Sequence, residues 1–268
     1  MDAINAYLSR QPAFSSAGLT RLNVAGHAVG WLEPQTVDFL LHHDATFQLK
    51  AGQMCVPDGL DINACSALFT AAAVAMRQAG LIRGWRDELY IGYAPTAQGG
   101  LDLAQPLFQL ERAAFRRFGL VSRAVHINGY TADGLVWVGR RASSKSIDPG
   151  KRDNLAAGGL PAGEAPFHCV IRELWEEAGV PSQLAQAAVA SGTLRTTRNE
   201  ADGTHDEVIE CFDLLLPPDF VPHNMDGEVA DFTAMPPAEL IAALDEFTWD
   251  AGAVSALFLQ RHGWVRQA

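Results

Sequence analysis

The most regular hydrophobic pattern in the chain covers residues 166–178. Its apolar residues recur at intervals of three and four, the spacing of a helix with one face on a core: Val170, Ile171, Leu174 and Ala178. Pro166 suits a first helical turn, because its φ is already helical and no amide proton is needed there. Gly179 and Pro181 then end the helix. The pattern predicts one amphipathic helix.

Three acidic residues share one face of this predicted helix. Glu173, Glu176 and Glu177 are spaced i, i+3 and i+4, which places their Cβ atoms roughly 5–6 Å apart. Like charges at this spacing destabilise a helix unless something neutralises them. One interpretation is a solvated acidic face, which is common. The other is a site for a hard divalent cation such as Mg2+, which takes carboxylate ligands and leaves room for substrate phosphates.

From Ser122 onward the remaining pattern is that of a sheet with helices. Segments 125–130 and 135–140 flank the turn dipeptide Asp133-Gly134 and predict a hairpin. Later segments add a loop at 143–154, strands at 189–198, 206–216 and 228–232, and helices at 237–247 and 250–262. This order predicts an α/β fold, a mixed sheet between helices in an α/β/α sandwich.

The first part of the chain has a different organisation. We predict a small α+β domain at 1–118, with a role in substrate specificity, and a second domain at 119–268. The expected strands are 22–24, 29–32 and 47–49, and the expected helices are 34–41, 61–79 and 107–118. In the last of these helices the basic residues are interpreted as a solvated face: Arg112, Arg116 and Arg117.

Composition and charge indicate which classes of binding partner the chain is suited to. The chain has 268 residues and a formal net charge of −11. An acidic surface repels nucleic acids and anionic membranes, so we expect neither as a partner. It would also repel a phosphorylated substrate unless bound cations reverse the local potential. The longest apolar stretch, 64–79, is too short and too interrupted to span a bilayer.

The four cysteines, Cys55, Cys65, Cys169 and Cys211, form no C-x-x-C pair and no zinc-ligand spacing, and are interpreted as reduced thiols. The first residues show no basic region followed by an apolar run. We therefore expect a soluble, cytoplasmic protein. The sequence does not decide between a monomer and a homodimer.

The acidic helix is part of a longer motif. Gly158 is followed after five residues by Glu164, and after seven more by Arg172-Glu173-Leu174, then Glu176-Glu177 and Gly179-Val180. This spacing resembles the Nudix box, G-x5-E-x7-R-E-U-x-E-E-x-G-U with U aliphatic, at every specified position.

The resemblance implies the Nudix fold and a hydrolase that directs water onto a diphosphate phosphorus. It assigns divalent metal, Mg2+ or Mn2+, to Glu173, Glu176 and Glu177, and the orientation of these carboxylates to Arg172. Gly158 and Gly159 would shape the loop before the helix, with Glu164 in support. Many members of the family add a later carboxylate, for which Glu228, with Asp226 beside it, is the candidate. The general base stays open among Glu177, Glu176 and a later carboxylate.

Substrate-binding residues are predicted outside the box. Arg83, Trp85 and Arg86 precede a probable strand. Arginine binds phosphate and tryptophan stacks on rings, so one interpretation is a substrate-contacting surface. The other interpretation, which we favour, is a salt-bridged strand edge with a partly buried tryptophan. Lys145, in the loop at 143–154, is assigned to the substrate as well.

A narrower resemblance covers nearly the whole chain. It rests on R-G-W-R-D-E-L-Y, H-I-N-G-Y and S-K-S-I-D-P-G-K-R-D-N-L-A-A-G-G-L-P-A-G-E. These segments are similar to a subgroup that joins an N-terminal domain of unknown function to Nudix, including fungal and plant proteins similar to thiamin-related phosphatases. This implies action on thiamin diphosphate or its oxidised analogues.

Two other functions fit the fold. Isopentenyl-diphosphate isomerases share it and a similar K-x-x-x-P-G loop, but need a reactive cysteine. Cys169 is expected on the helix side away from the glutamates. A non-catalytic ligand sensor is the third function, although its box would usually be eroded, whereas this one is intact. The sequence alone leaves the substrate open.

Overall fold

The structure is a computed structural model that describes residues 3–145 and 147–264. Its larger sheet is built around strand β7 (Val121–Thr131). Its main strand order is β11-β12-β7-β8-β13, with β10 paired to β7 and β9 paired to β8. β12 runs parallel to β7 and the other pairs are antiparallel. The sheet is therefore mixed, as predicted. Its other strands are β8 (Val136–Arg141), β9 (Arg152–Asp153), β10 (Ala156–Gly159), β11 (Val189–Glu200), β12 (Gly203–Leu216) and β13 (Val229–Met235).

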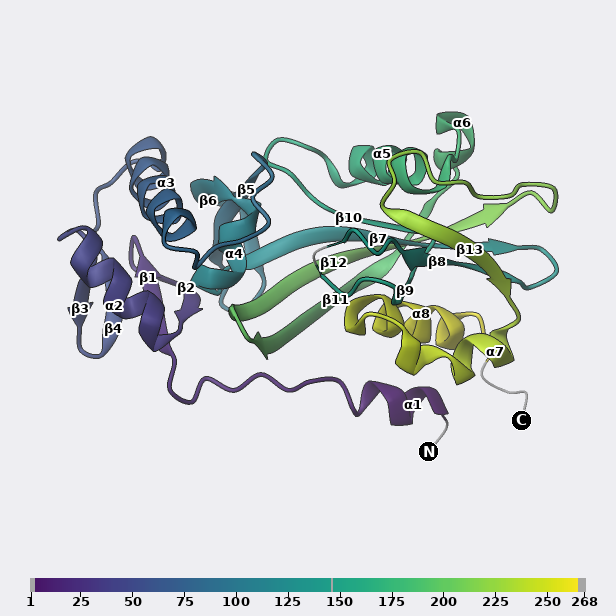
Figure 1. Cartoon of the computed structure of the whole chain (residues 1–268), viewed down its shortest axis with the longest axis horizontal. Coiled ribbons are helices and arrows are strands. Elements are labelled where there is room, and N and C mark those ends of the chain that lie inside the picture. The colour runs from purple at the N-terminus through teal and green to yellow at the C-terminus, as the bar shows by residue number, and fades with distance from the viewer. Residues whose placement is uncertain (1–2, 146, 265–268) are drawn as a thin grey trace.

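Helices cover both faces of this sheet (Figure 1). On one face α5 (Pro166–Ala178) packs its apolar side against inward-facing residues of β7 such as Val125 and Ile127. On the other, α8 (Trp249–Arg261) shares a core with Val136 and Val138 of β8. The shorter helices are α6 (Ser182–Ala185), α7 (Pro237–Ala242) and the 3-10 turn η1 (Leu244–Glu246). The predicted α/β/α sandwich is confirmed.

The smaller part of the molecule has its own core. A four-stranded sheet in the order β2-β1-β4-β3 packs with α2 and α3, and the hairpin β5-β6 leads into α4. At its centre Phe69 stacks on Phe108, with ring centroids 4.4 Å apart. The elements are β1 (Thr20–Val24), β2 (His27–Leu32), α2 (Pro34–His43), β3 (Gln48–Lys50), β4 (Gln53–Val56), α3 (Ile62–Gln78), β5 (Leu89–Pro95), β6 (Leu101–Glu111) and α4 (Arg112–Phe118).

The helix predicted over 107–118 is wrong in its first part. β6 continues to Glu111, and only Arg112–Phe118 is helical. Phe108 and Leu110 are both fully buried and pair with Gly92 and Tyr90 of β5. The spacing of Leu107, Leu110 and Ala114 favours a helix, but Phe108 and Leu110 are two residues apart, which is the spacing of one strand face, and pairing with β5 decides the outcome.

The predicted solvated face of that helix is also wrong for Arg117. Its side chain is buried, its Nε and Nη2 donate to the carbonyl of Leu81, and its Nη1 pairs with Glu33 at 3.1 Å. Arg116 instead pairs with Asp202, in the turn between β11 and β12.

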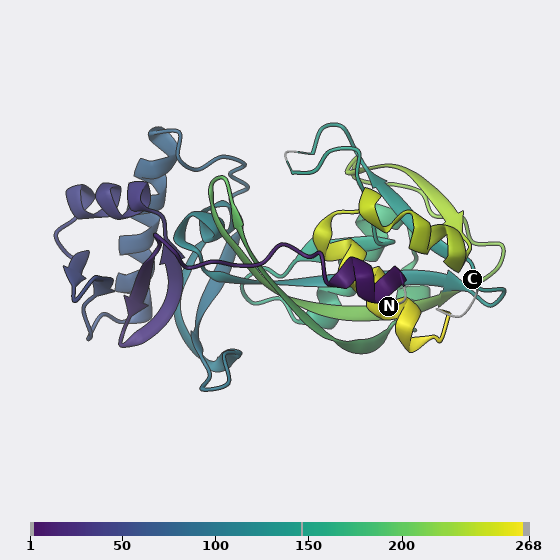
Figure 2. The same ribbon diagram turned by 90° about the horizontal axis from the view of Figure 1, so that it is seen from below.

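The first helix, α1 (Ala3–Leu8), does not pack with the elements that follow it in the sequence; it packs with the C-terminal helix α8. Ile4 and Tyr7 lie in the core that contains α8, and the ring of Tyr7 stacks on Trp249 at 6.1 Å. Residues 9–19 then run as an extended segment to β1 (Figure 2). Helix α1 thus packs against α8 in the larger part of the molecule, although the residues that follow it belong to the smaller part.

The two parts meet beside the loop that precedes α5. The backbone amide of Ala162 donates to the carbonyl of Leu89 at 2.7 Å. The hairpin β11-β12 extends from the larger sheet to the smaller part (Figure 2), and the carbonyl of Arg116 in α4 occupies the space where a β-carbon on Gly203 would lie. Across the described ranges, the helices are too short or too polar to cross a membrane.

Candidate active site

Helix α5 forms as its sequence predicts. Pro166 occupies its first turn, and Gly179 ends it in the left-handed conformation at φ 64°. Two backbone bonds close the last turn, from Gly179 to Trp175 and from Val180 to Leu174, both at 3.0 Å. The buried apolar side fixes the rotation of the helix, so that its glutamates face the β9-β10 segment.

The strand before the loop makes room for the glutamates. A β-carbon on Gly158 would overlap the carboxylate of Glu173, so only glycine leaves the space that this side chain occupies. The amide of Ala157 donates to Oε2 of Glu177 at 2.9 Å. Glu173 and Glu177 are 8% and 7% exposed, whereas the side chain of Glu176 is 40% exposed.

This burial changes the acidity of the two inner carboxyls. Burial raises the pKa of Glu173 to about 7, and the charge of Arg172 only partly counteracts it. Burial and the charge of Glu173 together raise the pKa of Glu177 well above its usual value. Two acids are thus held close together with little water to stabilise their ionised forms.

Arg172 connects the carboxylates of the box. Its Nε and Nη2 donate to both oxygens of Glu164, at 3.0 and 2.8 Å. Its Nη1 donates to Glu173 at 2.6 Å and to Glu176 at 3.0 Å. A planar guanidinium that makes four such bonds fixes the direction of each partner.

The structure also brings Glu228 and Lys145 to this group. The ammonium of Lys145 forms an ion pair with Glu228 and lies 4.0 Å from Oε1 of Glu177. Nη1 of Arg86, from the smaller part, lies 3.8 Å from Oε1 of Glu228. Burial alone would raise the pKa of Glu228, but the hydrogen bond from Lys145 and the nearby positive charges lower it. The carboxylate of Asp226 instead accepts the amide of Glu228 at 2.8 Å.

Two predicted substrate-binding residues lie elsewhere. The indole of Trp85 donates to Asp87 at 2.8 Å, packs against the core of the smaller part, and is covered by Arg77 at 4.8 Å. Arg83 is exposed and has no ion pair within residues 3–145 and 147–264. Arg86 and Lys145 are therefore brought to the carboxylates, whereas Trp85 is turned towards α3.

These residues fit a divalent cation. The ligands that they offer are carboxylate oxygens, the type that hard cations such as Mg2+ prefer. The raised pKa values of Glu173 and Glu177 show that the fold holds these groups where their negative charge lacks full compensation. Bound positive charge would supply it.

The placement predicted for Cys169 is wrong. This cysteine lies one helical turn before Glu173, and its sulfur contacts Nη2 of Arg172 at 3.3 Å and the carbonyl of Gly159 at 3.4 Å. It is fully buried, and burial raises the pKa of its thiol. A protonated, inaccessible thiol is a poor nucleophile.

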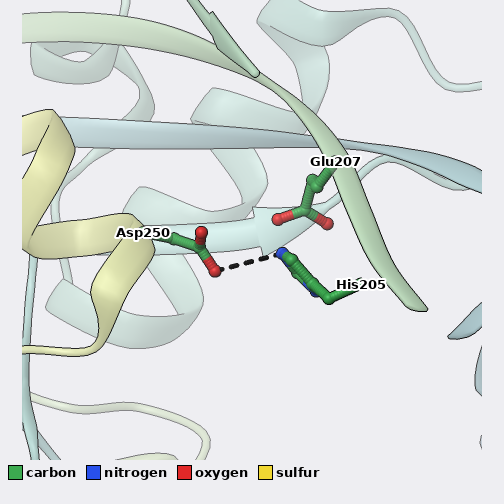
Figure 3. Close-up of side chains that lie close together, drawn as sticks. All are labelled: His205, Glu207 and Asp250. Atoms are coloured by element: carbon green, nitrogen blue, oxygen red, sulfur yellow. Dashed lines mark ion pairs between the residues drawn. The ribbon is translucent and has the colours of Figure 1, made fainter. Parts of the chain in front are cut away.

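A second group of potential ligands lies under α8, on the opposite face of the sheet (Figure 3). His205, Glu207 and Asp250 offer atoms within 4.8 Å of one another. Asp250 is already paired: Nη1 and Nη2 of Arg198 donate to its two oxygens at 2.8 and 3.1 Å, and Nε2 of His205 lies at 3.2 Å. Burial would raise the pKa of Asp250, but His205 and Arg198 lower it instead. The group is an ion-pair cluster that joins α8 to the β11-β12 hairpin.

Comparison with known families agrees with the geometry. Residues 121–258 match the model of the NUDIX domain, and residues 2–122 match that of a domain of unknown function, DUF4743. The chain belongs to the Nudix family. Nudix hydrolases act on diphosphate-containing compounds and generally use divalent metals, so the box carboxylates of this Nudix chain are its candidate active site.

Individual proteins with similar sequences include members of the same family. Nudix hydrolase 24, chloroplastic, from Arabidopsis thaliana is 39% identical over 193 residues, which cover 70% of this chain and 51% of the relative. An uncharacterised protein of Saccharomyces cerevisiae is 30% identical over 203 residues, 69% of this chain and 57% of that protein. The Nudix chain thus spans about half the length of the curated relatives it matches. Its cytoplasmic location stays a prediction, because the Arabidopsis relative is chloroplastic.

Among solved structures, the Nudix domain of Shewanella oneidensis NrtR in complex with ADP ribose is similar, with a TM-score of 0.44. The identity is 17%, and the match covers 57% of this chain and 99% of that chain.

Proposed function

We propose that this Nudix chain is a divalent-metal-dependent hydrolase that cleaves the diphosphate linkage of a small organic diphosphate. The observation that carries the proposal is the pair Glu173 and Glu177, buried beside one another and oriented by Arg172 and by the backbone of β10. Such a pair is costly to ionise without a cation, which makes it suited to binding one.

The carboxylates of Glu173, Glu176, Glu177 and Glu228 would hold the ion, Mg2+ or Mn2+. When bound, such an ion neutralises phosphate oxygens and acidifies a water molecule. Arg172 keeps Glu173 and Glu176 oriented throughout. The proton of the attacking water passes to a carboxylate of this group, with Glu177, Glu176 and Glu228 as the candidates.

Two cations of the chain would bind the substrate phosphates. Lys145 and Arg86 both lie beside Glu228 and close to the box. If Glu228 held a metal ion, Lys145 and Arg86 would lose part of their pairing with this carboxylate. Both could then donate to phosphate oxygens, as lysine and arginine do in many phosphate sites.

For the substrate we propose thiamin diphosphate or its oxidised analogues. The support is the resemblance of the sequence segments given above to thiamin-related proteins that join an N-terminal domain of unknown function to Nudix. The matches to DUF4743 and to the NUDIX domain agree with that domain order. The net charge of −11 also suits an organic group that is itself cationic, as the thiazolium ring of thiamin is. The isomerase alternative is disfavoured, because Cys169 is buried and protonated.

The test is incubation of the purified chain with a panel of diphosphates, measuring phosphate release and organic products. The panel includes thiamin diphosphate, its oxidised forms, ADP-ribose, NADH, nucleoside triphosphates and isopentenyl diphosphate. Release that requires Mg2+ and stops with a chelator supports the hydrolase. Release from a compound other than the thiamin diphosphates would replace the substrate and keep the reaction. Tight binding without any release would favour the ligand sensor.

A further inference from the structure

An arginine that the sequence pattern assigned to a solvated face lies close to the carboxylate site. Arg112 is the first residue of α4, in the smaller part of the molecule. Its guanidinium lies 5.4 Å from the ring centroid of Tyr90. The hydroxyl of Tyr90 in turn fills the space where a β-carbon on Gly159 would lie. Tyr90 therefore lies between Arg112 and β10, the strand that carries Gly158 and Gly159.

Arg112 lies next to the loop that reaches the carboxylate group. Nη1 of Arg112 donates to Glu88, which follows Arg86 by two residues, and Nη1 of Arg86 lies 3.8 Å from Oε1 of Glu228. Among the described residues, Arg112 itself makes no ion pair with Glu173 or Glu228.

Much of the guanidinium remains available. Nη1 of Arg112 donates to Glu88 at 2.5 Å, and this is its one side-chain hydrogen bond within the described ranges. The side chain is 40% exposed. An arginine carries five N–H donors, so most of its donors remain for a ligand, including the two parallel ones that match the oxygens of a phosphate.

Glu111 fixes the position of this arginine and of Arg86 together. Its carboxylate is buried and accepts three backbone amides, from Arg86 at 3.0 Å, Glu88 at 3.1 Å and Ala113 at 3.2 Å. The amide of Arg112 donates to the carbonyl of Glu88 at 2.9 Å. One buried carboxylate thus caps α4 and holds the loop that carries Arg86, which fixes the backbone at Arg86 relative to the start of α4.

We propose that Arg112 is a phosphate-binding residue, supplied by the smaller part of the molecule, that together with Arg86 holds the diphosphate against the Nudix carboxylates. The inference rests on the proposed hydrolase function. It means that the region matching DUF4743 completes the active site of the Nudix domain. The ligand class is a diphosphate, whose oxygens occupy the donors that Arg112 leaves unused. The alternative is that Arg112 only joins Tyr90 and Glu88 at the junction between the two parts.

The experiment uses the full chain and magnesium imidodiphosphate, a diphosphate analogue in which nitrogen replaces the bridging oxygen. Its dissociation constant is measured by calorimetry for the wild type, Arg112→Gln and the control Arg116→Gln. Arg116 belongs to the same helix but pairs with Asp202 in the distant hairpin turn. We expect Arg112→Gln to weaken binding by about tenfold to a hundredfold, the range for a lost hydrogen bond to a charged group. Arg116→Gln should bind within about twofold of the wild type, because it leaves Arg112 and its surroundings unchanged.

Two further measurements separate binding from folding. Thermal unfolding shows whether Arg112→Gln keeps its fold. Arg112→Lys keeps the positive charge but loses the planar guanidinium and its paired N–H donors. It should bind magnesium imidodiphosphate with intermediate strength. Equal binding by wild type and a folded Arg112→Gln would overturn this inference and leave the hydrolase intact. A wild type that binds no magnesium imidodiphosphate and hydrolyses no diphosphate would overturn both.

Discussion

The carboxylate of Glu173 occupies the space in which a β-carbon of residue 158 would lie, so that a glycine of β10 and a glutamate of α5 form one fitted pair. The two residues are 15 positions apart in the sequence and lie on different elements. Their fit explains physically why a glycine precedes the acidic helix by this distance: a larger residue would displace the glutamate that it faces.

This fit predicts the effect of Gly158→Ala. Because Glu173 is buried, its carboxylate cannot move into solvent without disturbing the site. We expect hydrolysis to fall by at least about a hundredfold, the scale of a displacement of about 1 Å in an active site. The cost in unfolding free energy should be about 1–3 kcal/mol, typical of overpacking. Steady-state rates and urea unfolding measure the two effects.

The matched control for this substitution is Gly100→Ala. At that position the nearest neighbour of an added β-carbon is the hydroxyl of Thr96, at 3.2 Å. This control should keep its activity. Full activity in Gly158→Ala would contradict the role given to the fitted pair.

The raised pKa of Glu173 predicts how stability depends on pH and metal. Its pKa is about 7 in the folded chain, compared with an ordinary value of 4.5. Between these values the folded state binds more protons than the unfolded state, so this group's stabilising contribution is lost as pH rises towards 7. Divalent cations bind the ionised carboxylate, so they compete with protons more easily at higher pH.

We therefore expect Mg2+ to raise the melting temperature more at pH 8 than at pH 6. Differential scanning fluorimetry with Mg2+ or with a chelator measures both values. A Glu173→Gln variant, which cannot ionise at this position, should show a smaller difference between the two pH values. An equal Mg2+ effect at both pH values in the wild type would count against a site built on this carboxyl.

The cluster under α8 predicts a stability effect without a direct effect on catalysis. Asp250→Asn removes one of the two acidic partners of Arg198, whose side chain is 9% exposed; the other partner is Glu200, at 2.7 Å. Removing one partner of a buried ion pair is strongly destabilising, and Glu200 still pairs with Arg198, so we expect a loss towards the lower end of about 3–5 kcal/mol in unfolding free energy. The control Asp231→Asn, which removes an exposed partner of Arg140, should change stability by less than about 1 kcal/mol.

At a temperature where Asp250→Asn remains folded, its hydrolysis rate should stay within about threefold of the wild type, because the cluster lies on the other face of the sheet from α5. Added divalent cations should not stabilise the wild type through this cluster. Loss of Mg2+ binding in the folded variant would instead make the cluster part of a metal site.

Glu111 should act as a positioning residue. In Glu111→Gln one acceptor oxygen becomes an NH2 group, which faces a backbone amide and cannot accept its hydrogen bond. The loop that carries Arg86 and the start of α4 should then loosen. We expect KM to rise by about tenfold while kcat changes by less than about threefold, the pattern of weakened substrate binding. A change in thermal stability with unaltered KM would show that Glu111 is only structural.

The sequence predicts the part of the site that depends on neighbouring residues, which is helix α5 and its three glutamates. Pro166, Gly179 and the spacing of the apolar residues define α5, and the spacing of three glutamates places them on one face. The helix ends and the shared face of the glutamates depend on residues only a few positions apart, so the spacing of residues in the sequence predicts them directly. The hairpin β7-β8 was predictable for the same reason, through its Asp-Gly turn.

The features that the sequence did not predict depend on distant partners. Leu107, Leu110 and Ala114 have helical spacing, but Phe108 and Leu110 pair with β5 as strand residues. The sequence pattern assigns Arg112 to a solvated helix face, but in the structure it packs on Tyr90, which in turn contacts Gly159, and it donates to Glu88. The partner of α1 lies on α8, almost the whole chain away. In each case tertiary contacts, which the local pattern does not contain, decide the outcome.

The most direct test of the account is the rate of diphosphate hydrolysis in Mg2+ by the wild type and two glutamate variants. Glu177→Gln keeps the size of a buried box residue and removes its charge, whereas Glu239→Gln makes the same change on the exposed surface of α7. We predict a loss of at least about a hundredfold in Glu177→Gln, since the carboxylate is assigned to metal binding, and an unchanged rate in Glu239→Gln. Equal rates in the wild type and a folded Glu177→Gln would contradict a metal-dependent hydrolase built on the carboxylates of the Nudix box.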